Sequence, residues 1–310
     1  LFEFSIRRNI TVIKGDSATG KTTLLHILYE YLRIGRQSGY AVSTNASYYV
    51  YIRDEVGRDW KDALYPLKNT VIFIEENNEF VFTKEFASYV KESGNYFVFV
   101  TRAPLKMLPY SIHEIYEIIT DGKRTDIKES YHEFKEIYSN YPIIENNKIQ
   151  NVVTEDSNSG YQFWMHAFKN SNVTSSNGNG NLIKCVKELG LGDTLVIADG
   201  AAFGSLIETC ISSFQIQTER RISLWLPESF EYLILKSGIL KSEKLILDNI
   251  PEYVECEKYE SWEKFFTEIL ITLTADGVEK YSKNILNSYY LQDWVVDKIK
   301  EQLPIEVINK

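Results

Sequence analysis

The sequence has few of the residues that cross-link or interrupt small folds. It has three cysteines in 310 residues, Cys185, Cys210 and Cys256, which are far apart and form no CxxC pair. Their odd number and wide spacing indicate neither a disulfide framework nor a zinc site, so we interpret them as small buried side chains in a reducing compartment. Seven prolines and sixteen glycines leave little room for long structureless linkers. The composition therefore excludes a disulfide-rich miniprotein and a disordered chain.

Long apolar runs are also missing. No stretch approaches the roughly 20 apolar residues that a membrane-spanning helix needs, and residues 1–20 lack the pattern of a signal peptide. We therefore expect a soluble, cytoplasmic protein without a membrane partner. Because the chain begins with Leu1 instead of Met, we also expect an amino terminus that has been processed or trimmed.

Positive charge is scarce in the second part of the chain. The formal net charge is −9, with 18 Lys and Arg against 20 Asp and Glu in residues 1–147 and 16 against 23 in residues 148–310. The second part thus carries −7. This balance disfavours tight, sequence-independent binding of nucleic acid, which depends on Lys and Arg to release counterions, although it leaves room for a local basic patch.

Large side chains are abundant instead. The chain has 21 Tyr, 16 Phe and 5 Trp, enough to bury two cores at this length. Apolar runs typical of strands alternate with helical patterns twice, within 10–100 and again within 151–226. The alternation predicts an α/β fold with two mainly parallel sheets, each flanked by helices. We expect domains at 1–147 and 148–250, followed by a helical carboxyl-terminal extension at 251–310.

Turn residues mark the boundary between the two series. Residues 139–142 and 145–148 are polar or interrupt regular structure, which places the linker near 140–149. Just before it, residues 115–131 predict a hairpin that closes the first domain, with its turn at 120–123.

One motif in the first domain carries specific chemistry. Residues 15–22 fit GxxxxGK[ST] between an apolar strand at 10–14 and a helix at 21–34. The glycines let the backbone wrap around phosphates, and the N–H groups and the helix dipole attract them. Lys21 would reach the β- and γ-phosphates, and the Thr22 hydroxyl would hold Mg²⁺. The motif predicts ATP and Mg²⁺ as cofactors, bound by Gly15, Asp16, Ser17, Ala18, Thr19, Gly20, Lys21, Thr22 and Thr23.

A second segment of the first domain supports this prediction. Residues 71–76, Val-Ile-Phe-Ile-Glu-Glu, resemble a Walker B strand, in which Glu75 would hold the metal and Glu76 would position the attacking water. Glu75 stands where Asp is usual, and a buried strand ending in solvated acids is the alternative. Arg102, after the next apolar strand, is either a sensor of the γ-phosphate or a surface charge. The sequence has no Leu-Ser-Gly-Gly-like signature, so an ABC-type ATP sandwich is not predicted.

The second domain contains three segments in a characteristic order. Residues 152–156, 195–204 and 223–228 are apolar strands that end in Glu155, in Asp199 and in Leu-Pro-Glu, respectively. Together they resemble the Toprim fold of bacterial primases, topoisomerases and related nucleases. In that family a Glu ends the first strand, an Asp-x-Asp ends the third, and a strand leading into Leu-Pro comes fourth.

The resemblance implies a metal site, which this sequence matches only in part. Glu155 and Asp199 match the family pattern, and as acids at neighbouring strand ends they would hold Mg²⁺ against a phosphodiester. The second Asp is absent because Ala201 stands in its place, and an alanine cannot ligate a metal. Asp156 and Glu228 are the two nearby acids that would compensate.

Two weaker candidates lie in the same domain. Residues 177–181, Asn-Gly-Asn-Gly-Asn, either bring their backbone close to a phosphate or form a turn before a helix. Arg220 and Arg221 either meet a phosphate backbone or form a solvated pair at the start of a strand.

The chain as a whole thus resembles a P-loop ATPase fused to a Toprim-like domain, similar in outline to the overcoming-lysogenization-defect nucleases used against phage. The resemblance implies an ATP hydrolase in which Lys21, Thr22, Glu75 and Glu76 act on ATP. Its nucleotide state would control an effector domain that acts on nucleic acid.

Two alternatives stay open. In one, the second domain has lost its chemistry and the protein is a nucleotide-dependent switch or scaffold with a protein partner, as Ala201 and the charge of −7 suggest. The other is a nucleotide kinase, although no arginine-rich lid is visible. A homo-oligomer is compatible with each of them.

Overall fold

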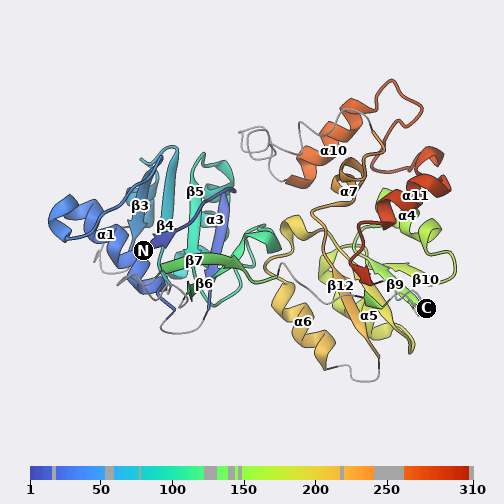
Figure 1. The fold of residues 1–310 in the computed structure, drawn as a ribbon, viewed down its shortest axis with the longest axis horizontal. Coiled ribbons are helices and arrows are strands. Elements are labelled where there is room, and N and C mark those ends of the chain that lie inside the picture. Colours follow the sequence, from blue (N-terminus) through green and yellow to red (C-terminus); the bar gives the residue numbers. More distant parts are fainter. Residues whose placement is uncertain are drawn as a thin grey trace. The chain divides into compact units, whose positions relative to one another are not determined.

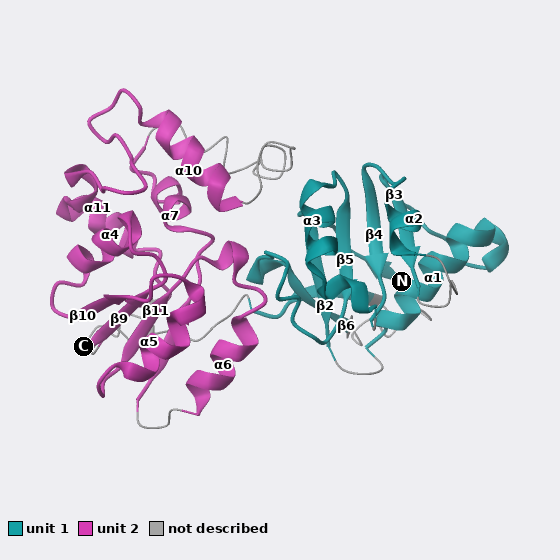
Figure 2. Cartoon of the chain, turned by 180° about the vertical axis from the view of Figure 1, so that it is seen from behind, with its two compact units in different colours: residues 1–139, 255–257 teal, residues 140–254, 258–310 magenta. Residues whose placement is uncertain are grey.

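The structure is a computed structural model, and contacts between Cα atoms divide the chain into two compact units (Figure 2). The described residues up to 138 belong to unit 1, and those from 144 onward belong to unit 2. Each unit holds one large sheet with helices beside it, and unit 2 also contains the short parallel pair β8–β13, so the predicted α/β class with two mainly parallel sheets is confirmed (Figure 1). The structure describes residues 1–15, 19–52, 59–76, 78–121, 131–138, 144–145, 149–216, 220–240 and 262–306.

The elements of unit 1 begin close to where the apolar and helical patterns predict them. The strand and helix on either side of the GxxxxGK[ST] motif have the predicted bounds. In chain order, unit 1 contains β1 (Phe2–Glu3), β2 (Ile10–Lys14), α1 (Lys21–Ile34), η1 (Gly35–Ser38), β3 (Ser47–Tyr51), α2 (Trp60–Leu64), β4 (Thr70–Ile74), η2 (Glu79–Phe82), α3 (Lys84–Glu92), β5 (Tyr96–Val100), η3 (Ile112–Glu114), β6 (Ile115–Asp121) and β7 (Tyr131–Glu136).

The seven strands of unit 1 form one sheet in the order β1-β7-β6-β2-β5-β4-β3. All neighbours are parallel except β6 and β7. Along β5, alternate side chains face opposite sides of the sheet. Val98 lies in the same core cluster as Leu24 of α1, whereas Phe97 and Phe99 contact Phe86 of α3 edge to face. Helices therefore cover both faces, as a parallel sheet requires.

The antiparallel pair β6–β7 confirms the predicted hairpin but not the start of its predicted turn. Thr120 pairs with His132 and Asp121 pairs with Tyr131, so β6 continues through the position where the turn was expected. Pairing within the sheet gives these backbone groups their hydrogen bonds, and this outweighs the local preference of a polar segment for a turn. The other two residues of the predicted turn, 122–123, lie outside the described residues.

Unit 2 follows the second predicted series, and its last predicted strand is followed by a further helix, as the mostly helical pattern after residue 226 predicts. That helix, α7, comes directly after the Leu-Pro-Glu segment and is capped by the Ser229 hydroxyl, which accepts from the Tyr232 N–H. The elements of unit 2 are β8 (Ile144–Glu145), β9 (Asn151–Thr154), α4 (Ser159–Ala167), β10 (Asn172–Ser175), η4 (Asn179–Asn181), α5 (Leu182–Glu188), β11 (Thr194–Ile197), η5 (Gly200–Ala202), α6 (Ile207–Gln215), β12 (Ile222–Trp225), α7 (Phe230–Lys236), α10 (Trp262–Leu273), η6 (Ser288–Leu291), α11 (Asp293–Lys300) and β13 (Ile305–Glu306).

The main sheet of unit 2 is entirely parallel, in the order β10-β9-β11-β12. From β9 the chain passes outward to β10, then returns to pair β11 with the other side of β9 and continues outward to β12. The strand order therefore reverses between β9 and β11. In open parallel sheets such a reversal opens a crevice at the carboxyl ends of the two strands, where ligands bind.

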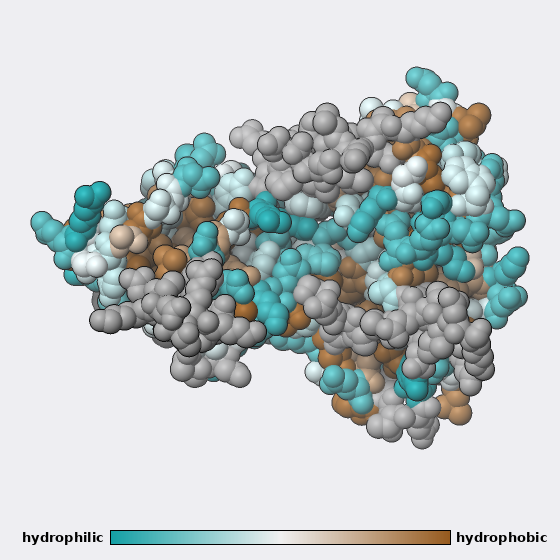
Figure 3. Space-filling view, viewed as in Figure 1, coloured by the Kyte–Doolittle hydropathy of each residue, from teal (hydrophilic) through white to brown (hydrophobic). Residues whose placement is uncertain are grey.

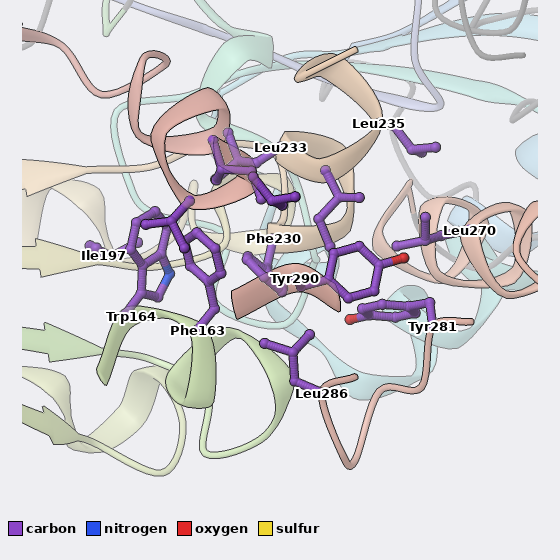
Figure 4. Packing of buried hydrophobic residues seen from close by; sticks show 14 of the residues in the cluster. Phe163, Trp164, Ile197, Phe230, Leu233, Leu235, Leu270, Tyr281, Leu286 and Tyr290 are labelled. Atoms are coloured by element: carbon purple, nitrogen blue, oxygen red, sulfur yellow. The ribbon is translucent and has the colours of Figure 1, made fainter. Parts of the chain in front are cut away.

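The core of unit 2 joins this sheet to the carboxyl-terminal helices. Val152 and Leu195 of the sheet belong to the same buried cluster as Phe163 of α4, Leu270 of α10 and Ile299 of α11. Figure 4 shows ten labelled members of the cluster converging from α4, α7, α10 and the segment around residue 286. The helices from residue 262 onward are thus part of the core of unit 2.

The described helices were compared with the length and hydropathy that a membrane span needs. None of the helices in the described ranges is both long enough and apolar enough to cross a membrane. On the face drawn in Figure 3, hydrophilic residues are interspersed with small hydrophobic patches.

The shared core of unit 2 can be tested on α10. Leu270 is fully buried in the cluster, whereas its neighbour Ile271 is 42% exposed. We expect Leu270→Ala to lower the free energy of unfolding by about 2–5 kcal/mol, because it removes buried methyl groups and leaves a cavity. Ile271→Ala is the matched control and should change it by less than about 0.5 kcal/mol. Urea denaturation followed by tryptophan fluorescence measures both, and equal stabilities of the two variants would contradict the packing of α10.

Candidate functional site

The first candidate site is the loop that joins β2 to α1. Gly15 and Gly20 have φ values of 124° and 95°, in the region that favours glycine, so both loop ends depend on these residue types. Lys21 is the first residue of α1, and its Nζ lies 2.6 Å from the Gly15 carbonyl oxygen and 3.0 Å from the Thr19 Oγ1. The ammonium group thus bridges the two ends of the loop. Residues 16–18 of the predicted site lie outside the described residues.

The first turn of α1 has features that favour an anion. Thr22 and Thr23 are exposed in the first turn, and that turn carries no acidic residue in the structure as described. The N–H groups of a first turn have no partners within the helix, and the helix dipole places positive charge there. The geometry therefore provides a place where phosphate oxygens are stabilised by N–H groups and one ammonium.

The predicted acids of unit 1 lie at the same edge of the sheet as this loop. Glu75 and Glu76 directly follow β4, and β5 separates β4 from β2 in a parallel arrangement. Because neighbouring strands are about 4.8 Å apart, the ends of β2 and β4 are separated by about 10 Å. The Arg102 Nε, just beyond β5, lies 3.5 Å from the Glu76 Oε1. The structure thus brings Arg102 to one of the predicted catalytic acids.

The second candidate site lies at the reversal of strand order in unit 2. Glu155 and Asp199 follow β9 and β11, and the Asp199 N–H donates to the Glu155 Oε2 at 3.0 Å. Both residues line a cavity of about 20 Å³, together with Trp164 and Phe230. That volume holds one water-sized particle. The structure therefore brings together the two acids that the sequence selected from separate strands.

A close approach of the backbone fixes the position of Asp199. A Cβ on the next residue, Gly200, would lie 2.6 Å from the Leu226 carbonyl oxygen, so no other residue type fits there without a shift. The Gly200 N–H donates to the Pro227 carbonyl at 2.6 Å, and the Ala201 N–H donates to the Glu228 carbonyl at 3.3 Å. The segment after β11 is therefore held against the segment after β12.

Of the two acids expected to compensate for Ala201, Asp156 lines the same cavity as Glu155 and Asp199, whereas Glu228 does not line it. Asp156 Oδ1 accepts the Tyr161 N–H at 2.7 Å, and its Oδ2 accepts the Gly160 N–H at 3.2 Å, so it caps the start of α4. Glu228 is buried but is not among the described residues that line the cavity. Helix capping satisfies both oxygens of Asp156, which explains its position.

Three charged residues that the sequence did not single out, Glu231, Glu263 and Lys283, interact electrostatically with Asp199. Lys283 Nζ is 2.8 Å from the Glu231 Oε1 and 3.2 Å from the Glu263 Oε1. Glu231, in the first turn of α7, is fully buried. No sequence pattern links these residues to Glu155, because they come from separate elements up to 128 positions away. Only the packing of α7, α10 and the segment around residue 283 brings them within electrostatic reach of Asp199.

Burial of these acids changes their protonation. Desolvation raises the pKa of Glu155 to about 7, helped by the charge of Glu263 and opposed by the hydrogen bond from the Asp199 N–H. Desolvation also raises the pKa of Asp199 well above its usual value, and the charges of Glu263 and Glu231 add to this, while Lys283 opposes it. A low-dielectric site disfavours the charged form of a carboxyl. Among the described residues, the Lys283 ammonium is the positive charge that opposes these shifts, and it does not cancel them.

The donor set fits a cation that prefers oxygen, although its ligands are not already assembled. No group of three His, Cys, Asp or Glu side chains is arranged to hold a metal ion within the part of the chain that the structure describes. Glu155 and Asp199, however, line the same cavity. Carboxylate oxygens are the ligands that Mg²⁺ and Ca²⁺ prefer, so a divalent cation would offset the repulsion between the two acids.

The weaker candidates of unit 2 have structural partners. Asn177 and Gly178 have φ values of 53° and 110° and form a turn before η4 and α5, and the Gly178 N–H donates to the Glu155 carbonyl. Arg220 donates to the carbonyl oxygens of Leu189 and Gly190 at the carboxyl end of α5. The idea of a solvated arginine pair is therefore wrong for Arg220, which satisfies carbonyl groups that the helix leaves open.

No protein-family model matches the chain, and neither a curated protein nor a solved structure matches it.

The raised pKa of Glu155 makes a prediction about stability and pH. Because the folded state disfavours the ionised form, folding loses stability as pH rises from about 4.5, the usual value, to about 7. Glu155→Gln keeps the acceptor for the Asp199 N–H but cannot ionise. We expect it to match the wild type at pH 4 and to exceed it by on the order of 1–3 kcal/mol at pH 8 in EDTA. Urea titrations at several pH values measure this, and parallel curves for the two proteins would contradict it.

Proposed function

We propose that unit 1 binds and hydrolyses ATP with Mg²⁺, and that unit 2 is a Toprim-like effector that takes a divalent cation and acts on nucleic acid. The observation that carries the proposal is the position of Lys21. Its ammonium bridges the ends of a glycine-bounded loop between a parallel strand and the first turn of a helix. This combination of backbone N–H groups, helix dipole and one lysine stabilises phosphate groups.

In unit 1 we assign the binding of phosphate, of the cation and of the attacking water to different residues at the sheet edge. The Lys21 ammonium would contact the β- and γ-phosphates in place of Gly15 and Thr19, and the Thr22 hydroxyl and Glu75 would hold Mg²⁺. The cation would neutralise part of the phosphate charge. Glu76 accepts a hydrogen bond from the attacking water and so orients it.

In unit 2 the proposal assigns cation binding to Glu155 and Asp199, which line one cavity at the ends of β9 and β11. The crevice at the reversal of strand order lets a phosphodiester approach the same edge. A cation held there by carboxylates stabilises the negative charge of a phosphodiester under attack. The nucleotide state of unit 1 would control this activity.

A second function is favoured by one observation. Lys283 already lies within 3.2 Å of two carboxylates, and Ala201 removes a family ligand. The lysine would then serve as a permanent counter-ion. Unit 2 would bind a protein partner, and ATP would act as the switch.

The phosphate site is tested by Lys21→Ala. We expect the variant to lose at least about tenfold in ATP affinity and to show no ATP turnover, since the ammonium is the main charged contact with the phosphates. Isothermal titration with Mg-ATP and a phosphate-release assay measure the two effects. Lys84→Ala, an exposed lysine of the same unit, is the matched control and should behave as the wild type. Unchanged turnover in Lys21→Ala would remove the hydrolase assignment.

The cation site of unit 2 is tested by Asp199→Asn. We expect this variant to lose Mn²⁺-dependent cleavage of DNA or RNA by at least about 100-fold, because the amide cannot supply the negative charge of the carboxylate. Asp193→Asn, just before the other end of β11, is the matched control, because its side chain only accepts the Arg221 N–H. Cleavage by the wild type that is lost only in Asp199→Asn excludes the scaffold function, whereas no cleavage by any protein supports it.

A further inference from the structure

Two pairs of stacked rings join the amino-terminal segment of unit 1 to β7. Phe2 pairs with His132 in the parallel register of β1 and β7, and their ring centroids lie 4.5 Å apart with an angle of 16° between the planes. Two residues further along each segment, the rings of Phe4 and Phe134 stack at 4.3 Å and 3°. Because alternate residues of a strand face the same side of a sheet, both pairs lie on one face of the sheet.

The first ring pair contacts the loop that would hold the phosphates. A Cβ on Gly20 would lie 3.5 Å from the Phe2 Cζ and 3.8 Å from the His132 Cε1. Gly20 is the N-cap of α1, directly before Lys21. In both views the amino-terminal end lies beside α1 (Figures 1 and 2). The edges of the two rings therefore lie against the end of the loop between β2 and α1.

The Phe2 ring keeps part of its surface accessible. Phe2 is half-buried and packs against the core cluster that contains Ile13 and Leu24. Its strand, β1, is the outermost described strand on this side of the sheet, with β7 as its neighbour. One face of the ring lies on His132. The other face is therefore turned toward the outer edge of the sheet.

The ring pair differs chemically from the phosphate loop beside it. Desolvation lowers the pKa of His132, so the imidazole is neutral at pH 7 and supplies no charge for the phosphates. Phe2 has no polar atom in its side chain. The pair thus offers an aromatic face, which matches another flat ring and does not match an anion.

We propose that Phe2 is the stacking platform for the base of the bound nucleotide, and that His132 is a positioning residue that holds the Phe2 ring from its other face. This inference rests on the proposed ATP site. The ribose separates the base of a nucleotide from its phosphates, so the base lies beside the phosphate loop and not inside it. Stacking of a base on an aromatic side chain strengthens binding by about 5–100-fold.

The test compares ADP with pyrophosphate, which has two linked phosphates but neither ribose nor base. Neither ligand has a γ-phosphate to hydrolyse. Phe2→Leu keeps an apolar side chain beside Gly20 but removes the aromatic face. We expect its Kd for Mg-ADP to rise by about 5–50-fold relative to the wild type, while its Kd for Mg-pyrophosphate stays unchanged. Isothermal titration calorimetry on the full chain measures both.

Phe4→Leu is the matched control. Phe4 is also half-buried, but its ring stacks on Phe134 and meets that of Phe73 in β4 edge to face at 6.3 Å. The three atoms nearest to a Cβ on Gly20 belong to Phe2 and its partner on β7, and none belongs to Phe4. Both variants lose one stacked ring from the same segment. Phe4→Leu should bind both ligands as the wild type does, and urea denaturation measures the stability of the two variants separately.

The outcomes separate this inference from the function on which it rests. Equal weakening of ADP and pyrophosphate in Phe2→Leu would make Phe2 a support of the loop and overturn the base platform, as would unchanged affinity for both. Lys21→Ala should weaken both ligands, which tests the phosphate site by itself. No saturable binding of either ligand to the wild type would remove the ATP site, and the base platform with it.

A second variant covers the case in which Phe2→Leu does not fold. His132→Asn removes the ring on which Phe2 stacks but leaves Phe2 in place. Its Kd for Mg-ADP should rise by about 2–10-fold, with no change for Mg-pyrophosphate. Wild-type affinity for Mg-ADP in His132→Asn would then overturn the proposal.

Discussion

In a parallel sheet, the ends of all strands point to one edge, and both candidate sites of this protein depend on that constraint. The loop before Lys21 follows β2, and Glu75 follows β4 two strands away. In unit 2, the tips of β9 and β11 place Glu155 against the backbone of Asp199. Residues that are distant in sequence become neighbours because hydrogen bonding between parallel strands aligns their carboxyl ends.

In unit 2, several carboxylates lie close enough to interact electrostatically in a partly buried site. Among the described residues, five carboxylates interact there with the ammonium group of Lys283. Carboxylates so close together in a partly buried site are unfavourable unless protons, a lysine or a metal balance their charge. The two candidate functions of unit 2 differ in which of these supplies the balance. With a divalent cation, unit 2 would act on nucleic acid as proposed. With Lys283 alone as the counter-ion, unit 2 would instead bind a protein partner under the control of ATP.

The differences between expectation and structure have a common cause. Asp156 lines the cavity beside Glu155, but both of its oxygens also accept N–H groups at the start of α4. Arg220 looked solvated, but the open carbonyl groups at the end of α5 take its guanidinium. In each case a polar side chain forms hydrogen bonds with backbone groups at a helix end that have no partner within the helix. The pattern of residue types along the sequence does not show which helix end lies near which side chain.

The sequence by itself determined the order of strands and helices, the β2–α1 unit around Lys21, and the choice of Glu155 and Asp199. These features are local: an apolar period, a glycine that permits a positive φ, or an acid at the end of a buried strand is visible within a few residues. Tertiary structure alone decided that Glu231, Glu263 and Lys283 interact electrostatically with Asp199. They come from α7, α10 and the segment near residue 283, and the packing of those elements depends on contacts among more than a hundred residues.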